Sequence, residues 1–487
     1  MSMIQVEGLT FAYPSGSENI FENVTFRIDT DWKLGFVGRN GRGKTTFLKL
    51  LCGQYEYRGK ISASVRFDYF PYPVREKERP TAEILREACP EAEDWQFLRE
   101  LAALGMEADI FYQPFDTLSG GEQTKALLAA LFLNEGHFLL IDEPTNHLDA
   151  ESRKAVAKYL QRKKGFILVS HDRRFLDGCV DHILALNRAE ITVENGNFSS
   201  YMERFEKRQE GEKAQNERAE RDIRRLKQSA ERTAQWANKV EVSKIGAYDK
   251  GYVGHKAAKM MKRAKVTEAR KQQAVEQKSA LLKNLETAED LKISPLEYFF
   301  ETLLSVADLE IDYGTGAVCS GVSFSVKRGE RVFLDGRNGS GKSSILKLIA
   351  GEATPYRGTV RIGSRLIVSY VPQDTSFLCG SLAEFAREHG LNEPLFKAVL
   401  NKMDFEKKQF ETDMREFSGG QKKKALIAKS LCESAHLYVW DEPLNFIDVY
   451  SRMQIERLIE EFAPTMLLVE HDGAFREKLA SKIVSLF

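Results

Sequence analysis

The sequence predicts two α/β domains, each with a parallel β-sheet, joined by a long α-helical hairpin. A glycine-rich octapeptide occurs twice, at residues 38–45 and 336–343, and each copy stands between an apolar strand-like segment and a helix-like segment. The segment 201–292 separates the two copies, contains no proline and is rich in charged residues. A chain of 487 residues has room for two domains and such a connector.

Each repeat shows the same order of expected elements, displaced by 298 to 300 residues. A strand leads into the octapeptide, a helix with an apolar face follows it, and further buried strands come later in each repeat. The expected strands are 4–11, 33–37, 138–141 and 166–169 in the first repeat, and 303–311, 331–335, 437–440 and 466–469 in the second. This order is typical of a parallel-sheet α/β core. We expect the first domain at 1–197 and the second at 297–487.

The formal net charge of zero hides an uneven distribution. Segment 201–292 carries 23 Lys and Arg against 15 Asp and Glu, whereas the rest of the chain carries 48 against 56. The connector is therefore basic and the domains are acidic. The six cysteines are dispersed without a C-x-x-C pair, which indicates a reduced, cytosolic protein. No run approaches 18 apolar residues and the N-terminus lacks a signal-like segment, so we expect neither membrane insertion nor export.

The octapeptide has the spacing G-x-x-x-x-G-K-[ST], which points backbone N–H groups and a helix N-terminus at phosphate oxygens. Lys44 and Lys342 would neutralise phosphate charge, and Thr45 and Ser343 would ligate Mg²⁺. One match could be a mere glycine turn, but two matches in equivalent contexts favour a nucleotide site, with ATP and Mg²⁺ as cofactors. The expected nucleotide-binding residues of these loops are Gly38, Asn40, Gly41, Gly43, Lys44, Thr45, Thr46, Gly336, Asn338, Gly339, Gly341, Lys342, Ser343 and Ser344.

An Asp-Glu pair ends an apolar strand in each repeat, at 142–143 and 441–442. Asp142 and Asp441 would lie near the Mg²⁺ shell, while Glu143 and Glu442 would orient and deprotonate the attacking water. A single pair could be a solvated strand end, but two pairs at equivalent distances from the phosphate loops favour catalysis. Two histidines also stand at equivalent places after later strands, where they could reach a γ-phosphate: His171 and His471.

The segment 118–123, Leu-Ser-Gly-Gly-Glu-Gln, resembles the signature of the ATP-binding-cassette (ABC) superfamily, and 417–422 repeats it in part. The resemblance implies two P-loop NTPase domains whose signatures each cap the nucleotide held by the other domain. Site one would join the first phosphate loop, Asp142, Glu143 and His171 with Ser418, Gly419 and Gly420. Site two would join the second phosphate loop, Asp441, Glu442 and His471 with Ser119, Gly120 and Gly121. Tyr13 and Tyr313 fall where the family stacks adenine.

The two repeats depart from the family pattern in different ways. Gln373 matches the family's metal-sensing glutamine, which implies contact with Mg²⁺ and nucleotide, but Tyr72 stands at that place in the first repeat. After the second acidic pair, Leu444 replaces the threonine found in the first repeat as Thr145. Both catalytic glutamates are present, so we expect hydrolysis at both sites with unequal rates.

The connector at 198–296 predicts a hairpin of two long helices. Ser200 to Glu203 has capping-box spacing for the first helix, and three glycines near 242–256 suit a tip. Residues 239–271 hold ten Lys or Arg and three acids, which fits contact with nucleic-acid phosphates, although a solvated spacer is the alternative. Two tyrosines there could stack on bases. The residues expected to reach a partner are Lys244, Tyr248, Lys250, Tyr252, His255 and Lys256.

The basic connector and the lack of membrane segments resemble the ABC-F group over essentially the whole chain. That resemblance implies a cytoplasmic monomer whose two ABC domains pair, bound to the 70S ribosome near the exit site, the large-subunit rRNA and the P-site tRNA. Segments 72–119 and 373–418 are nearly equal in length, so the arm common in housekeeping members is missing. Three features resemble the Lsa-type antibiotic-resistance branch: the missing arm, Leu444 and the sequence of 251–261. That branch displaces lincosamides, streptogramins A and pleuromutilins.

Three alternatives stay open at this stage. A housekeeping translation factor would share the same motifs. The ATPase subunit of a membrane transporter would have no evident use for a basic connector. A DNA-repair ATPase typically carries its coiled coil inside the ATPase domain, whereas here the helical segment joins two complete repeats.

Overall fold

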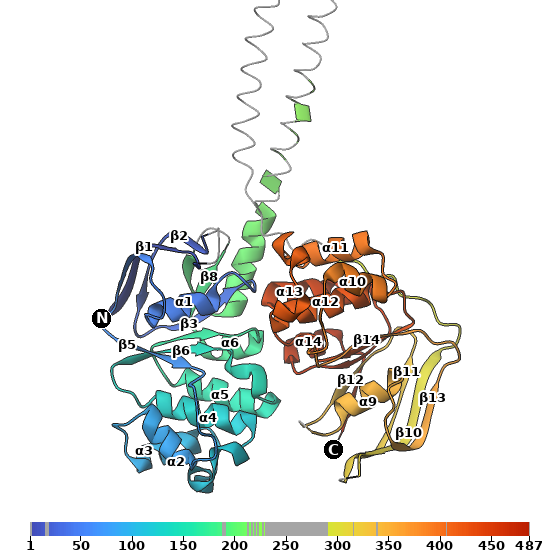
Figure 1. Ribbon diagram of the computed structural model, residues 1–487, viewed down its shortest axis with the longest axis horizontal. Helices are drawn as coiled ribbons and strands as arrows, with labels where there is room; N and C mark the ends of the chain where they lie inside the picture. Colours follow the sequence, from blue (N-terminus) through green and yellow to red (C-terminus); the bar gives the residue numbers. More distant parts are fainter. Residues whose placement is uncertain are drawn as a thin grey trace, which may run out of the picture. The chain divides into compact units, whose positions relative to one another are not determined.

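A computed structural model describes residues 2–14, 19–187, 191–211, 291–314, 316–337, 339–405 and 407–486, with scattered positions between 214 and 228 (Figure 1). The chain divides into two compact units, one made of residues 1–201 and 288–487 and the other of 202–287. The first unit holds both α/β repeats, which confirms the two predicted α/β domains, whereas most of the predicted helical hairpin lies outside the described residues. Several predicted site residues lie outside the described residues: Lys244, Tyr248, Lys250, Tyr252, His255, Lys256 and Asn338.

A largely parallel sheet forms the centre of each repeat. In the first repeat the strand order is β5-β6-β7-β3-β8-β9, and only β9 runs antiparallel to its neighbour. Its strands are β3 (Lys33–Gly38), β5 (Arg66–Phe70), β6 (His137–Asp142), β7 (Phe166–Val169), β8 (His182–Leu186) and β9 (Ile191–Asn195). In the second repeat the order is β14-β15-β16-β12-β17. Its strands are β12 (Arg331–Asp335), β14 (Val368–Val371), β15 (Leu437–Asp441), β16 (Met466–Val469) and β17 (Lys482–Ser485).

A three-stranded antiparallel sheet accompanies each parallel sheet. The orders are β2-β1-β4 and β11-β10-β13. These strands are β1 (Met3–Phe11), β2 (Phe21–Asp29), β4 (Arg58–Ser62), β10 (Thr302–Asp312), β11 (Ala317–Lys327) and β13 (Tyr356–Ile362). In the first repeat Phe47 joins the two sheets, because its buried ring contacts Phe21, Phe26 and Phe36 at centroid distances of 5.6 to 6.0 Å.

The helices fall into equivalent positions in the two repeats. Those of the first repeat are α1 (Lys44–Leu51), α2 (Thr81–Ala88), α3 (Asp94–Ala103), α4 (Gly120–Leu131), α5 (Ala150–Gln161) and α6 (Arg173–Cys179). Those of the second are α9 (Lys342–Ile349), α10 (Leu382–Glu388), α11 (Glu393–Lys402), α12 (Gly419–Cys432), α13 (Val449–Phe462) and α14 (Gly473–Leu479). Short 3₁₀ turns are η1 (Ala108–Tyr112), η2 (Phe115–Thr117), η3 (Pro144–His147), η4 (Lys407–Glu411) and η5 (Met414–Glu416). In Figure 1, α2, α3 and α4 lie together in one repeat, as do α10, α11 and α12 in the other.

The segment between β5 and α4 has the same make-up as its counterpart between β14 and α12. The first holds α2, α3, η1 and η2, and the second holds α10, α11, η4 and η5. Neither segment contains an additional helical arm in its described residues.

The connector helix is capped by Asn197, three residues before the predicted cap Ser200. The helix begins at residue 198, and Asn197 caps it by accepting a hydrogen bond from the Ser200 N–H at 3.1 Å. The Ser200 hydroxyl instead donates to the carbonyl oxygen of Asn197 at 2.9 Å. Asparagine caps as well as serine does, so either residue could have started the helix on composition alone.

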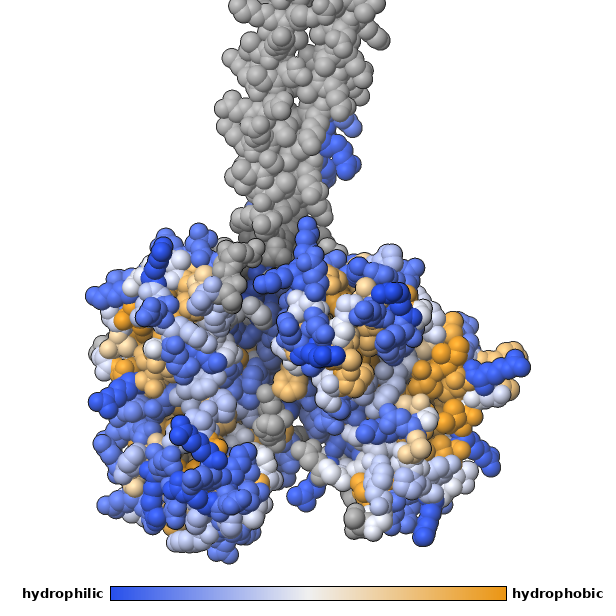
Figure 2. Space-filling view, viewed as in Figure 1, coloured by the Kyte–Doolittle hydropathy of each residue, from blue (hydrophilic) through white to orange (hydrophobic). Residues whose placement is uncertain are grey.

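The visible surface in Figure 2 is mainly hydrophilic, and apolar side chains gather in the region of β11 and β13. Tyr356 and Ile362 of β13 are among the large apolar residues exposed on the molecule. Within the described part of the chain, every helix is too short or too polar to cross a membrane.

Candidate nucleotide-binding and catalytic sites

The two phosphate loops have the same backbone form. Gly41 and Gly43 have φ values of 80° and 99°, and Gly339 and Gly341 have φ values of 82° and 84°, in the left-handed region that glycine adopts without steric strain. A Cβ on Gly43 would lie 2.5 Å from the Ile20 side chain, so the loop is closely packed as well as left-handed. Each loop runs directly into α1 or α9, whose free N-terminal N–H groups favour an anion.

The lysine of each phosphate loop is held across its own loop. Lys44 Nζ donates to the carbonyl oxygens of Gly38 and Arg39 at 2.7 and 3.1 Å. Lys342 makes the equivalent pair of bonds at 2.7 and 2.8 Å. Burial lowers the pKa of both lysines, so a bound phosphate would stabilise their charged form.

The oxygen groups expected to hold Mg²⁺ lie together in both sites. Thr45 Oγ1 donates to Asp142 Oδ2 at 2.7 Å. In the second repeat Ser343 Oγ lies 3.5 Å from Gln373 Oε1. Neither buried carboxylate oxygen of Asp441 has a hydrogen-bond partner, and burial raises its pKa to about 6, although the nearby Ser343 hydroxyl opposes that rise. Hydroxyl, amide and carboxylate oxygens are the donors that Mg²⁺ prefers, so the residues fit this ion.

Glu143 lies half-buried beside the phosphate loop at the end of β6. Its φ of 50° is left-handed, and its N–H donates to Val169 O at 2.9 Å, which ties the end of β6 to β7. Burial, helped by the charge of Asp142, raises the pKa of Glu143 to about 8. His171 Nε2 lies 3.2 Å from Glu143 Oε1, and burial together with the charge of Lys44 lowers the pKa of His171 well below its ordinary value. The pair therefore favours a neutral imidazole beside a carboxyl that is largely protonated at neutral pH.

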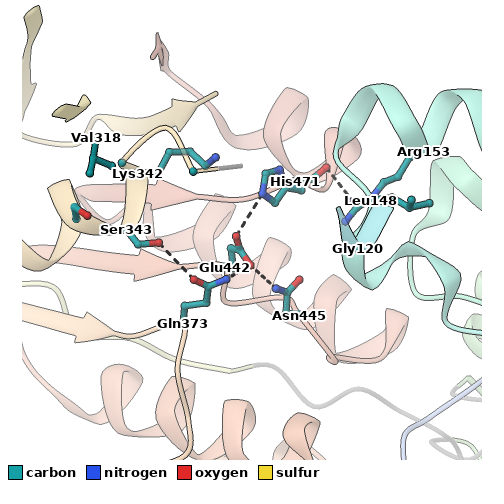
Figure 3. A pocket seen from close by; sticks show the side chains of 13 residues that line it. Gly120, Leu148, Arg153, Val318, Lys342, Ser343, Gln373, Glu442, Asn445 and His471 are labelled. Atoms are coloured by element: carbon teal, nitrogen blue, oxygen red, sulfur yellow. Dashed lines mark hydrogen bonds and ion pairs between the residues drawn. The ribbon is translucent and has the colours of Figure 1, made fainter. Parts of the chain in front are cut away.

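Glu442 has the equivalent position but different partners (Figure 3). Its Oε2 accepts hydrogen bonds from Gln373 Nε2 at 2.8 Å and Asn445 Nδ2 at 2.5 Å, and His471 Nε2 lies 3.4 Å from Oε1. Burial alone would raise the pKa of Glu442, but His471, Asn445 and Lys423 together hold it below the ordinary value. The same residue type is therefore ionised in one site and largely protonated in the other at neutral pH.

Residues from both repeats line each cavity, as the predicted cross-pairing requires. The cavity of site one brings residues of the first repeat together with three signature residues of the second. Among its lining residues are Tyr13, Asn40, Gly41, Gly43, Lys44, Thr45, Thr46, Asp142, Glu143, His171, Ser418, Gly419 and Gly420. The cavity of site two is lined by, among others, Gly120, Gly339, Gly341, Lys342, Ser343, Ser344, Gln373, Glu442 and His471. Figure 3 shows Gly120, Leu148 and Arg153 facing His471 and Glu442.

Some predicted residues adjoin the cavities without lining them. Gly38 and Gly336 accept from the loop lysines, and Asp441 lies at the end of β15. Ser119 and Gly121 flank Gly120, and the Ser119 N–H is held by Glu122 Oε2 at 2.8 Å in a capping box.

The two tyrosines predicted to stack on adenine have different surroundings. Tyr13 lines site one, packs edge-on against Phe11 and Tyr55, and its hydroxyl lies 2.8 Å from Thr46 Oγ1. Tyr313 is half exposed and donates to Ser344 Oγ at 3.1 Å, whereas the cavity of site two is lined at this part of the chain by Val318. The stacking role of both stays a prediction.

Four functional candidates were missed by the sequence analysis. Tyr69 of β5 donates to Asp142 Oδ2 at 3.0 Å. Arg153 donates to Thr145 O and also, across the repeats, to His471 O at 3.3 Å. Lys423 donates to the carbonyl oxygens of Pro372, Gln373 and Asp441. The repeat offset could have identified Arg153 and Asn445, because Arg452 and Asn146 stand at the equivalent places. Tyr69 likewise matches Tyr370, two residues before the shared proline, whereas Lys423 has Thr124 as its equivalent and was indicated by no pattern.

The exchange of threonine for Leu444 is accompanied by a second exchange in the same repeat, at Glu470. In the first repeat Thr145 Oγ1 lies 3.2 Å from Ser170 Oγ. In the second, Glu470 replaces that serine, and its carboxylate accepts from the N–H groups of Leu444, His471 and Asp472 at 2.8 to 3.2 Å. A buried carboxylate thus does for the second repeat what two hydroxyls do for the first, so Leu444 needs no polar side chain.

The unequal glutamates predict different pH profiles for the two sites. The Glu442→Gln variant leaves only Glu143 as a base, and its kcat/KM for ATP hydrolysis should rise with pH through about 8, because Glu143 must lose its proton first. The Glu143→Gln variant should show no such rise, because Glu442 is already ionised. Steady-state rates from pH 6 to 9 test this, and superimposable profiles would refute the assignment.

Comparison with known proteins agrees with this geometry. The ABC transporter family matches residues 21–146 and 319–445, more than half of the chain. The ribosome protection protein VmlR of Bacillus subtilis (strain 168) is 27% identical, over 97% of this chain and 85% of that protein. The energy-dependent translational throttle protein EttA of Escherichia coli (strain K12) is 26% identical, over 96% and 89%. A solved complex of the archaeal ribosomal stalk protein aP1 with the archaeal ribosome recycling factor aABCE1 has a similar fold, with a TM-score of 0.63 and 20% identity over 98% of this chain and 87% of that one. This chain therefore belongs to the ABC transporter family and is an ATPase with two ATP-binding domains.

Proposed function

We propose that this ATPase is an ABC-F protein that binds the ribosome in an ATP-dependent manner and displaces lincosamide, streptogramin A or pleuromutilin antibiotics from it. The proposal places the protein in the cytoplasm as a monomer bound to the 70S ribosome. The basic connector would enter the exit site, near the large-subunit rRNA and the P-site tRNA, and its tip would act on the drug pocket.

The observation that carries the proposal is the presence of two composite sites in one chain whose halves are joined by a basic connector. Each cavity is lined by residues of both repeats, so nucleotide binding can draw the repeats together without any partner chain. Two curated relatives are named a ribosome protection protein and a translational throttle protein, and both align over almost the whole of this chain.

Each composite site contains groups that can bind phosphate and groups that can accept a proton. Lys44 and Lys342 bind phosphate oxygens, while Glu143 and Glu442 accept a proton from the attacking water. His171 and His471 lie beside these carboxyl groups and would hold them toward the γ-phosphate. Magnesium, when bound, would neutralise charge on the phosphates next to Asp142 and Asp441. Hydrolysis would then let the repeats separate and the protein leave the ribosome.

Antibiotic displacement is favoured by the armless first repeat. The segments between β5 and α4 and between β14 and α12 contain equivalent elements, as in the Lsa-type branch that the sequence resembles. The alternative is a housekeeping translation factor, which the similarity to EttA favours. A transporter subunit explains the connector less well than either.

Removing both bases should trap the closed protein on ribosomes. With Glu143→Gln and Glu442→Gln together, hydrolysis should fall by about 10²- to 10⁴-fold while ATP still binds, because the phosphate loops are intact. Sedimentation with ribosomes in ATP, compared with ADP, measures the trapping. A doubly substituted protein that stays free of ribosomes in ATP would contradict the proposal.

Antibiotic displacement should appear as a change in growth inhibition. Expressing the protein in a susceptible host should raise the inhibitory concentration of lincomycin or tiamulin. A version with residues 242–256 shortened should lose that protection while keeping its ATPase rate, because both composite sites lie outside this segment. Unchanged inhibition by every drug of the three classes, with ribosome binding retained, would favour the housekeeping role.

A further inference from the structure

Asp404 occupies a left-handed backbone position, a conformation that favours glycine. It follows α11 with a φ of 69°, and the equivalent residue after α3 in the first repeat is Gly105, with a φ of 70°. Glycine enters this left-handed region freely, whereas an aspartate there is strained. Asp404 therefore places a carboxylate where the first repeat has no side chain.

Asp404 faces two arginines of the phosphate loop in the opposite repeat. Its Oδ2 lies 3.4 Å from Arg39 Nη1 and 3.4 Å from Arg42 Nη2. The side chains of Arg39 and Asp404 are only 6% and 17% exposed, so solvent screens this contact weakly. Site two lacks the same set, because Ser340 stands at the place of Arg42 and Gly105 at the place of Asp404.

Tyr450 of α13 makes a second contact with the same loop. The Arg39 guanidinium lies over the Tyr450 ring, 5.8 Å from its centroid. The Tyr450 hydroxyl lies 3.1 Å from the hydroxyl of Tyr201, which is fully buried near the start of the connector helix. The equivalent of Tyr450 in the first repeat is Glu151, which is exposed.

We propose that Asp404 and Tyr450 are positioning residues that latch site one, and that Tyr450 links this latch to the base of the connector through Tyr201. The latch holds the phosphate loop of the first repeat against the second, so site one releases nucleotide more slowly than site two. Separation of the repeats at site one must then break or displace the Tyr201–Tyr450 contact. This inference concerns the ATPase itself and does not depend on the ribosome as partner.

Nucleotide release from each site tests the latch. Lys342→Ala restricts tight binding to site one and Lys44→Ala restricts it to site two, so the release of a fluorescent ATP analogue can be followed at one site at a time. Adding Asp404→Gly should accelerate release from site one by about three- to tenfold. Release from site two should not change. Equal rates with and without Asp404→Gly at site one, or equal acceleration at both sites, would overturn the latch.

The Asp404→Gly variant is chosen because it should leave the stability of the fold unchanged. Glycine accepts the φ of 69° without strain, so the melting temperature of Asp404→Gly should not fall, and slower folding or misfolding cannot account for faster release. Conversely, Gly105→Asp with Ser340→Arg should slow release from site two, since a Cβ on Gly105 meets nothing within 4 Å. Failure of this transfer alongside an unchanged Asp404→Gly would reject the inference.

Tyr450→Phe tests the link to the connector separately. The variant keeps the ring beneath Arg39 but loses the hydroxyl, so release from site one should stay within about twofold of the parent. Amide hydrogen exchange in residues 197–205 should become at least about threefold faster, because the Tyr201 contact is lost. Unchanged exchange in this segment would show that Tyr450 does not link the site to the connector.

Discussion

The architecture depends on the close approach of each phosphate loop to the signature helix of the other repeat. At site one Asn40 Nδ2 donates to Phe446 O at 2.5 Å, across the two repeats. A Cβ on Gly420 would lie 2.5 Å from that carbonyl oxygen and 2.8 Å from Asn40 Nδ2, so only glycine fits between them. The N-terminus of α12 thereby faces the phosphate-binding loop with its free N–H groups and its partial positive charge. Neither repeat has a complete site alone, so any change that separates the repeats also separates the residues of both sites.

Two sites with the same motifs differ in electrostatics because their surroundings differ. Burial and the charge of neighbouring Asp142 raise the pKa of Glu143, so its carboxyl stays protonated, and the adjacent His171 is neutral. At Glu442 the hydrogen bond and charge of His471, followed by Asn445 and Lys423, outweigh the effect of burial and favour the ionised form. The first repeat has Tyr72 where Gln373, which donates to Glu442 Oε2, stands in the second.

The sequence predicted the elements that follow from periodicity and repetition. The strands at 166–169, 331–335 and 466–469 have the predicted bounds, and the other expected strands differ by one residue at most at either end. The phosphate loops and acidic pairs could be assigned because their spacing is tied to a chemical task. The signature segments were located from their sequence. Their pairing with the phosphate loop of the other repeat was inferred only from the family resemblance.

What could not be predicted depends on contacts between residues far apart in the chain. Nothing near Asp404 indicates that it faces Arg39, which lies 365 residues earlier. The replacement of Ser170 by Glu470 explains Leu444 only once Glu470 Oε2 is seen to accept from the Leu444 N–H. Several good capping residues follow one another before the connector helix, so residue type alone did not single out Asn197 over Ser200 as its cap. In each case the role of the residue follows from its neighbours in the folded chain and not from its residue type.

The central claim is that each site is completed by the opposite repeat, and Gly420→Ala tests it most directly. The added Cβ would collide with Phe446 O and Asn40 and separate the signature from the first phosphate loop. ATP hydrolysis measured with Glu442→Gln, which reports site one, should fall by at least about tenfold, while hydrolysis measured with Glu143→Gln, which reports site two, should be reduced much less. Loss of hydrolysis at site two with site one intact would contradict the account, because the signature would then serve the site of its own repeat.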